Sequence, residues 1–370
     1  MSFATSKPFS IGIQLSHDPF RPPAGFIREE ATIIAQDGWG GAWCQGEGEG
    51  LGARAGRDGP SYQDAGVPAQ GAAFVMRNTI AVMNTKGGVG KSTLVMALAE
   101  TLSAYHGKNV LVIDSDSQAS VSSMLMTVAN LHRLQSDGAT IVDYLIGRVL
   151  QNADPQWTSF VVRNVSDVDD ARTVFVIPSD MQLTLFEREV SKESLHGNLR
   201  LAISALLNEA RSVFDVVLID CPPGLSVLTE CWLREADFHV SPTKADYISL
   251  CGLEVFRRFK ALNPEMGFAH NLGVIINMKD AHSASEQDYH GWLAADPDNR
   301  CFAWTLPRMN ALQDAARFQP GERSYFAKYP GQVGDAVRGL ANEVLERMAQ
   351  APMPATAGLQ DEAPAAVAAQ

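Results

Sequence analysis

The stretch that decides the fold begins with Ile80-Ala81-Val82-Met83-Asn84 and continues, after Thr85, as Lys86-Gly87-Gly88-Val89-Gly90-Lys91-Ser92-Thr93. The first part is a short apolar run, which predicts a buried strand. The second part has no side chains at Gly87, Gly88 and Gly90, so successive backbone N–H groups can turn toward a bound anion. The periodic segment that follows predicts a helix, whose N-terminus also favours an anion. The stretch therefore predicts a strand–loop–helix unit that grips phosphate.

The side chains of this loop indicate which phosphate compound it holds. A P-loop places its lysine on the β and γ phosphates and its hydroxyl on Mg²⁺. Lys91 and Ser92 occupy these two positions, and Thr93, one residue further along, can bond the α-phosphate. We therefore predict that ATP and Mg²⁺ are the cofactors and that Lys91 acts on the transferred phosphate.

One position departs from the general P-loop pattern. The pattern has glycine where this chain has Thr85, and an additional lysine, Lys86, stands inside the loop. KGGVGKST resembles the deviant Walker A motif of the ParA/MinD family of P-loop ATPases, and the resemblance extends over roughly residues 76–348. It implies a homodimer that forms on ATP binding, in which Lys86 of each subunit reaches the nucleotide of the other and supports hydrolysis.

Apolar runs and amphipathic segments alternate along the chain after residue 76. The runs are rich in Val and Ile, as buried parallel strands are, and cover residues 79–83, 109–113, 173–177, 214–219, 238–240 and 272–276. The segments between them repeat apolar residues every three or four positions, which predicts helices, for example at residues 92–105, 195–211, 249–262 and 333–348. The sequence therefore predicts an α/β fold of the P-loop NTPase class, with a doubly wound, mostly parallel sheet in three layers.

Two aspartates follow the second predicted strand, in the order Asp114-Ser115-Asp116-Ser117-Gln118. Carboxylates at the carboxyl end of a strand beside a phosphate loop can hold Mg²⁺ through water and orient the attacking water. The segment resembles the DxDPQ segment that forms switch I of the family. The resemblance implies a Mg²⁺-shell role for Asp114 and the hydrolytic role for Asp116. Ser117 replaces the proline of the family pattern.

A later predicted strand ends in Asp220 and is followed by Cys221-Pro222-Pro223-Gly224. Four apolar residues and then an aspartate form the Walker B arrangement, which places a carboxylate beside Mg²⁺. We therefore predict that Asp220 contacts the ion through water. The two prolines stiffen the loop, while Gly224 leaves a flexible point where a backbone N–H can sense the γ-phosphate, as a switch II requires.

Two further strand ends resemble those of the family. Residues 274–277 read Val-Ile-Ile-Asn and resemble the strand whose asparagine reads adenine; an amide can both donate to and accept from the base edge. We predict that Asn277 contacts adenine, although an asparagine also ends many strands as a plain turn residue. Residues 305–308 resemble a later strand end and add Pro307 to the predicted nucleotide site.

Composition limits the other classes of protein. The 30 Lys and Arg against 42 Asp and Glu give a formal charge of −12, so contact with nucleic acid requires a local basic patch. No apolar run approaches the roughly 20 residues that cross a bilayer, and the start lacks a signal-peptide pattern, so we expect a cytoplasmic protein without stable membrane insertion. The absence of CxxC spacing favours reduced thiols over a disulfide framework or zinc site for the five cysteines, Cys44, Cys221, Cys231, Cys251 and Cys301.

The two ends of the chain differ from the middle. Residues 1–75 are crowded with Gly and Pro and show no periodicity, which predicts a disordered leader. Alternatively, translation begins at Met76 and the leader results from a wrongly assigned gene start. Residues 76–350 form the predicted ATPase domain. Residues 351–370 are rich in Ala and Pro and predict a disordered tail.

The family resemblance implies a timed switch. Such a ParA-like ATPase dimerises around ATP, binds DNA without sequence preference and hydrolyses ATP slowly, stimulated by a ParB-like or cargo adaptor protein, to partition or position a plasmid, a chromosome or a protein cargo. Bound to DNA, it would be nucleoid-associated. Two clusters are candidate DNA contacts, or else ordinary solvated charges: Arg257, Arg258 and Lys260, and Arg317, Arg323 and Lys328.

Other functions are compatible with the same loop. The main alternative is a MinD-like or other positioning ATPase that acts on a membrane or protein scaffold instead of DNA. A nitrogenase-iron-protein-like electron donor and a small-molecule kinase or amide synthetase of the same superfamily are further alternatives. The last of these would need a substrate pocket, for which the sequence offers no assignable set of residues.

Overall fold

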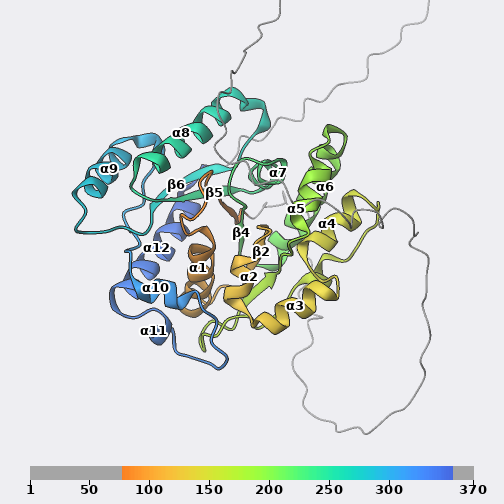
Figure 1. The fold of residues 1–370 in the computed structure, drawn as a ribbon, viewed down its shortest axis with the longest axis horizontal. Helices are drawn as coiled ribbons and strands as arrows, with labels where there is room; N and C mark the ends of the chain where they lie inside the picture. The colour runs from red at the N-terminus through yellow and green to blue at the C-terminus, as the bar shows by residue number, and fades with distance from the viewer. Residues whose placement is uncertain (1–76, 353–370) are drawn as a thin grey trace, which may run out of the picture. The chain divides into compact units, whose positions relative to one another are not determined.

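The computed structural model describes residues 77–352, so the predicted leader and nearly all of the predicted tail lie outside the described residues. Within the described range, the strands form one parallel sheet in the order β3-β2-β4-β1-β5-β6 (Figure 1). The strands are β1 (Thr79–Val82), β2 (Val110–Asp114), β3 (Val174–Ile177), β4 (Val216–Asp220), β5 (Phe238–Thr243) and β6 (His270–Ile276). The predicted doubly wound α/β class is confirmed.

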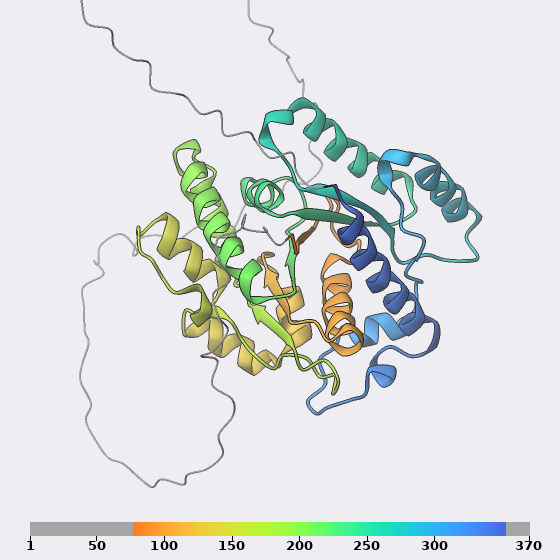
Figure 2. The ribbon, with the colours of Figure 1, turned by 180° about the vertical axis from the view of Figure 1, so that it is seen from behind.

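Helices cover both faces of the sheet, because successive strand residues point to opposite sides. Ile80 and Val82 belong to one core, and Ala81 and Met83 to the other. The first core is covered by α1 (Lys91–His106), α2 (Ser120–Leu125), α3 (Val128–Ser136), α10 (Asn310–Ala315), α11 (Tyr325–Lys328) and α12 (Gly331–Gln350). The second is covered by α4 (Ile141–Val149), α5 (Leu183–Val190), α6 (Glu193–Val213), α7 (Val227–Glu235) and α8 (Tyr247–Leu262). Figure 2 shows the same layers from behind.

The strand order places the functional motifs together. From β1, the chain builds β2 and β3 on one side of the sheet and β5 and β6 on the other. In open α/β sheets, ligands bind outside the carboxyl ends of the strands, where this order reverses. The loop after β1 and the aspartates that end β2 and β4 lie at this edge, since β4 pairs with both β1 and β2.

The predicted elements agree with the observed ones to within a few residues at each end. The largest extension is in β5, which continues through Pro242 to Thr243. It does so because β6 still pairs with it on one side, while the side-chain amide of Asn84 donates to the Pro242 carbonyl at 2.8 Å on the other. The strand end suggested at residues 305–308 is wrong, because this segment makes only an isolated bridge between Lys279 and Pro307. No helix among residues 77–352 is long and apolar enough to span a membrane.

Candidate functional site

The loop between β1 and α1 has the backbone that its glycines predict. Gly88 and Gly90 have φ values of 70° and 84°, in the left-handed region that residues with side chains rarely adopt. A Cβ atom at Gly90 would also lie 2.3 Å from the side-chain nitrogen of Asn277. The loop opens directly into α1, whose first residue is Lys91. The loop amides and the helix N-terminus therefore form a cradle for phosphate.

The two lysines of the loop lie in different environments. Lys91 is 6% exposed and belongs to the interior of the cradle. Lys86 lies at the rim, where its Nζ is 3.0 Å from Asp246 Oδ2 and donates to Ser249 Oγ at 3.1 Å. Asp246 is the N-cap of α8. One lysine is therefore committed to the inside of the loop, while the other is held at the surface by a carboxylate.

Asp114 and Asp220 are direct neighbours at the carboxyl ends of β2 and β4. Both are fully buried, and burial raises the pKa of both carboxyls, to about 6 for Asp114; the Asp114 carboxylate adds to the rise at Asp220. Among the described residues, neither oxygen of Asp220 has a hydrogen-bond partner. A buried carboxylate without a partner beside a phosphate cradle fits a bound cation. Asp220 and Ser92, the second residue of α1, are therefore suited to hold Mg²⁺.

Asp114 is bound differently from Asp220. Its Oδ2 accepts from the amide and the hydroxyl of Ser122 at 2.9 and 2.6 Å, and its Oδ1 accepts from the Asp116 amide at 3.2 Å. Asp116 is partly exposed, and its carboxylate accepts from the Gln118 amide at 3.0 Å. Asp114 therefore ties the segment to α2, while Asp116 is the carboxylate of this segment that solvent or substrate can reach.

Asn277 and Pro307 line a small cavity of about 40 Å³ together with Thr93. The Asn277 side chain is already occupied at both ends: its Nδ2 donates to the Val89 carbonyl at 2.7 Å, and its Oδ1 accepts from the Met278 amide at 2.8 Å. Asn277 therefore supports the phosphate loop directly, which the sequence did not indicate. Pro307 and Thr93 line the same cavity as Asn277, so the structure brings the predicted nucleotide-site residues together there.

Comparisons with known proteins agree with this geometry. The sequence profile of the AAA domain family matches residues 77–266. The chromosome partitioning protein ParA of Caulobacter vibrioides is 30% identical over 274 residues, which cover 72% of this chain and 94% of that protein. The chain belongs to the ParA/MinD family of P-loop ATPases.

Solved structures also resemble this ParA-like chain. A cobyrinic acid a,c-diamide synthase from Mycobacterium smegmatis, with ADP and magnesium bound, matches with a TM-score of 0.58 at 22% identity, over 74% of this chain and 96% of that one. A plasmid partition protein from Borrelia burgdorferi matches with a TM-score of 0.53 at 21% identity, over 73% and 99%. At these identities the matches support the fold alone.

The basic cluster suggested near the end of this ParA-like chain is wrong as a DNA contact. The Lys328 side chain is fully buried between Glu100 Oε1 at 2.6 Å and Asp167 Oδ1 at 2.7 Å. Arg323 also pairs with Asp167, and its side chain is only 13% exposed. Both cations therefore neutralise buried carboxylates inside the fold, and only Arg317 of this cluster is exposed.

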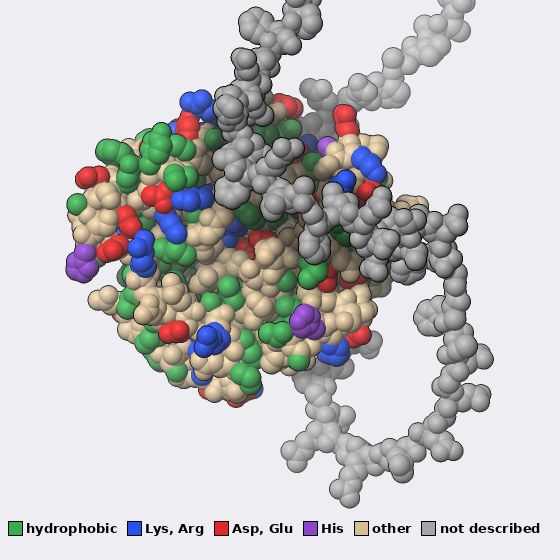
Figure 3. Space-filling model, viewed as in Figure 1, with side chains coloured by type: hydrophobic (Ala, Val, Ile, Leu, Met, Phe, Trp, Pro, Cys, Tyr) green, Lys and Arg blue, Asp and Glu red, His purple; other side chains and the backbone are tan. Residues whose placement is uncertain are grey.

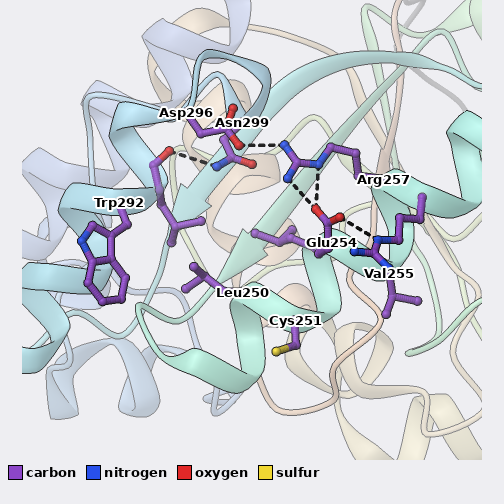
Figure 4. Close-up of a pocket in the computed structure, with 11 residues that line it drawn as sticks. Leu250, Cys251, Glu254, Val255, Arg257, Trp292, Asp296 and Asn299 are labelled. Carbon is purple, nitrogen blue, oxygen red and sulfur yellow. Dashed lines mark hydrogen bonds and ion pairs between the residues drawn. The ribbon is translucent and has the colours of Figure 1, made fainter.

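The cluster on α8 is also largely neutralised. Arg257 pairs with Glu254 of the same helix and with Asp296, which follows α9 (Ala284–Ala295), as Figure 4 shows. Arg258 pairs with the same Glu254. On the face drawn in Figure 3, basic and acidic side chains are interspersed and form no broad basic area. The ParA-like surface therefore offers less free positive charge than the sequence suggested.

A cavity of about 450 Å³ lies between α8 and α9 (Figure 4). Its lining is apolar at Leu250 and Trp292, and the ion pair between Arg257 and Asp296 closes one end. None of the predicted nucleotide-site residues lines it. The cavity is therefore lined by other residues than the predicted nucleotide site.

Two residues that shape the ParA-like site have contacts that its sequence motifs do not predict. Asn84 accepts from the Lys86 amide at 2.8 Å and donates to β5, so it fixes the start of the phosphate loop. Asp246 has the residue type and the position of a helix N-cap. Its carboxylate accepts a hydrogen bond from the amide of Ser249, three residues later, at 2.7 Å. Nothing in the sequence indicates that Asp246 also holds Lys86.

Proposed function

We propose that this chain is a ParA-like switch that binds Mg-ATP, pairs with a second copy of itself across the nucleotide, and hydrolyses ATP slowly to partition or position a cargo. Membership in the ParA/MinD family and the fit of the site to Mg²⁺ and phosphate support the nucleotide chemistry. Pairing, slow turnover and the cargo go beyond the family assignment and are the parts to be tested.

The observation that carries the proposal is the separation of the two lysines. Lys91, at 6% exposure, is placed to serve the nucleotide of its own subunit. The Lys86 side chain is 26% exposed and is held at the rim by the partly exposed carboxylate of Asp246 and the hydroxyl of Ser249, so it can leave them and reach a facing subunit. A cation supplied in trans stabilises the charge that develops on the γ-phosphate during transfer. Hydrolysis then depends on pairing.

Other residues of the site bind phosphate, hold Mg²⁺ and orient the attacking water. The amides of residues 87–90 and the N-terminus of α1 bind the phosphate oxygens. Ser92 and Asp220 hold Mg²⁺, which when bound neutralises phosphate charge. Asp116 orients the attacking water, because it is the exposed carboxylate of its segment. Asp114 keeps that segment in place through Ser122.

The platform on which the switch acts is either DNA or a protein scaffold. Similarity to chromosome partitioning proteins favours DNA, bound without sequence preference, and an adaptor protein that stimulates hydrolysis. The burial of Lys328 and Arg323 favours the alternative, a protein scaffold, because two of the candidate DNA contacts are unavailable. Cosedimentation with random-sequence DNA at two salt concentrations separates the two, since phosphate contacts weaken steeply with salt.

Light scattering during size-exclusion chromatography tests the pairing. We expect a dimer with Mg-ATP for the wild type and a more persistent dimer for Asp116→Ala. Lys91→Ala should lose nucleotide binding, and Lys86→Ala should bind nucleotide but stay monomeric. Lys108→Ala, just beyond the far end of α1, is the matched control and should behave as wild type. Monomers under all conditions, or normal dimers for both loop variants, would contradict the proposal.

A further inference from the structure

Ser115 stands between the two aspartates of the segment after β2 and is completely buried. Its amide donates to the Asp220 carbonyl at 3.0 Å. Its Oγ accepts from the indole Nε1–H of Trp232 at 2.6 Å. Trp232 lies on α7 and is also completely buried. The residue before Asp116 is thus attached to the end of β4 and to a side chain of α7.

We propose that Trp232 is a positioning residue for ATP hydrolysis, which acts through Ser115 to fix the backbone that presents Asp116. The inference rests on the proposed function, because it assumes that Asp116 orients the attacking water. It adds a side chain that touches neither nucleotide nor metal and that lies outside every motif of the sequence.

The local contacts explain why Asp116 needs this support. The hydrogen bonds of Asp116 itself stay within its own segment: its amide donates to Asp114, its carboxylate accepts from the Gln118 amide, and its carbonyl accepts from the Ala119 amide. Ala119 has a φ of 49°, so a residue with a Cβ is held in the left-handed region. The hydrogen bond from Trp232 therefore anchors this turn to a different element. The other hydrogen bonds of Asp116 come from within the turn.

The α7 helix also begins at the other switch. Ser226 caps it by accepting from the Thr229 amide at 3.2 Å, two residues after Gly224, and the Ser226 hydroxyl donates to Glu187 on α5 at 2.8 Å. A shift of the segment around Gly224 would therefore act on the same helix that carries Trp232, because close-packed interiors transmit small displacements.

Trp232→Phe is the primary test, because phenylalanine keeps most of the packing and removes only the N–H donor and part of the ring. A displacement of about 1 Å at a reacting group can cost up to about 100-fold in rate, so we expect kcat to fall at least about fivefold. KM for ATP should stay within about twofold of wild type, because no phosphate contact is lost.

Trp157→Phe is the matched control. The indole of Trp157 also donates to a side chain at 2.6 Å, but to Glu209 on α6, and Trp157 packs against Phe214. The control removes the same donor from a nearly buried ring elsewhere in the fold. It should lower the free energy of unfolding comparably and leave kcat unchanged, which separates positioning from general destabilisation.

Ser115→Ala provides a second route that leaves the indole intact. If the hydrogen bond carries the effect, this variant loses kcat to a similar degree, and the double variant with Trp232→Phe loses no more than the larger single loss. Near-ultraviolet circular dichroism with Mg²⁺ and a non-hydrolysable ATP analogue gives an independent readout. The wild type should show a nucleotide-induced tryptophan signal that Trp157→Phe keeps and that Trp232→Phe and Ser115→Ala lose.

The outcomes separate the two proposals. A wild type that does not hydrolyse ATP in its dimeric state refutes the proposed function, and the positioning role with it. A wild type that hydrolyses ATP while Trp232→Phe and Ser115→Ala match the Trp157→Phe control refutes the positioning role alone. Fully additive losses in the double variant show that the two residues act separately and also refute it.

Discussion

Replacing Asp246 by asparagine tests whether the chain restrains its own trans-acting lysine. Asparagine is about as good a helix N-cap as aspartate, so the bond to the Ser249 amide and the start of α8 are kept. The negative charge that holds Lys86 is lost. If Lys86 must leave Asp246 before it can reach a second subunit, the variant should dimerise more readily on Mg-ATP than the wild type.

The magnitude follows from the exposure of the pair. The Nζ–Oδ2 distance is 3.0 Å, and the two side chains are 26% and 38% exposed. A pair this accessible contributes about 0.2–1 kcal/mol. Since two pairs open per dimer, the free energy of pairing should improve by about 0.4–2 kcal/mol, a roughly 2- to 30-fold lower dissociation constant.

Sedimentation velocity with Mg²⁺ and a non-hydrolysable ATP analogue measures the dissociation constant. Asp335→Asn is the matched control, because it removes one carboxylate from a surface ion pair with Arg338 on α12, away from the loop. The gain should disappear in the double variant Lys86→Ala, Asp246→Asn. A dissociation constant for Asp246→Asn equal to that of the control, or a gain that survives loss of Lys86, would refute the reasoning.

Three other substitutions test different parts of the structure. Lys328→Met leaves the buried Glu100 without a cation and Asp167 with Arg323 alone, which should cost about 3–5 kcal/mol in urea unfolding; a loss under 1 kcal/mol would contradict the buried network. Burial lowers the pKa of His239 to about 3, so its contribution to stability is complete above the unfolded value of 6.5 and is lost as pH falls below it. Between pH 6.5 and 5 the wild type should therefore lose about 2 kcal/mol more than His239→Gln. Asn277→Ala removes a donor to the phosphate loop and should weaken ATP and GTP binding alike by about 5- to 10-fold, whereas a loss confined to ATP would assign base reading to this residue.

The sequence predicts those features of this protein that depend on residues close together in the chain. Lys91, Ser92 and Asp220 are predictable because each stands at a fixed offset from a strand, and the strand order brings their elements to one edge. Lys328 is a counterexample, since its partners Glu100 and Asp167 lie 228 and 161 residues away. A lysine in solvent and a lysine that neutralises buried acids look the same in a sequence.

The same limit applies to the contacts that control the site. Asp246 and Trp232 act on residues 160 and 117 positions away in the chain. Helical periodicity predicts that Trp232 is buried but not which polar atom its indole meets. The chemistry of the loop is therefore readable from the sequence, whereas the contacts that restrain Lys86 and position Asp116 depend on the packing of distant elements.

Among residues 77–352, two pairs of buried carboxylates have different partners. Glu100 and Asp167 are neutralised from within by Lys328. Asp114 and Asp220 are also fully buried, but the oxygens of Asp220 have no hydrogen-bond partner among the described residues. The first pair is neutralised as part of folding, whereas we predict that the second is neutralised by a cation that binds with the nucleotide.

This difference predicts how Mg-ATP binding depends on pH. Burial raises the pKa of both carboxyls, to about 6 for Asp114, so as pH falls through about 6 the acid pair takes up protons that must be displaced when the cation binds. Affinity should therefore fall as pH decreases through about 6. Since ATP also takes up protons in this range, the quantity to measure by calorimetry is the difference between the wild type and Asp114→Asn. Parallel pH profiles would show that no proton is exchanged at Asp114 when the cation binds and would refute this prediction.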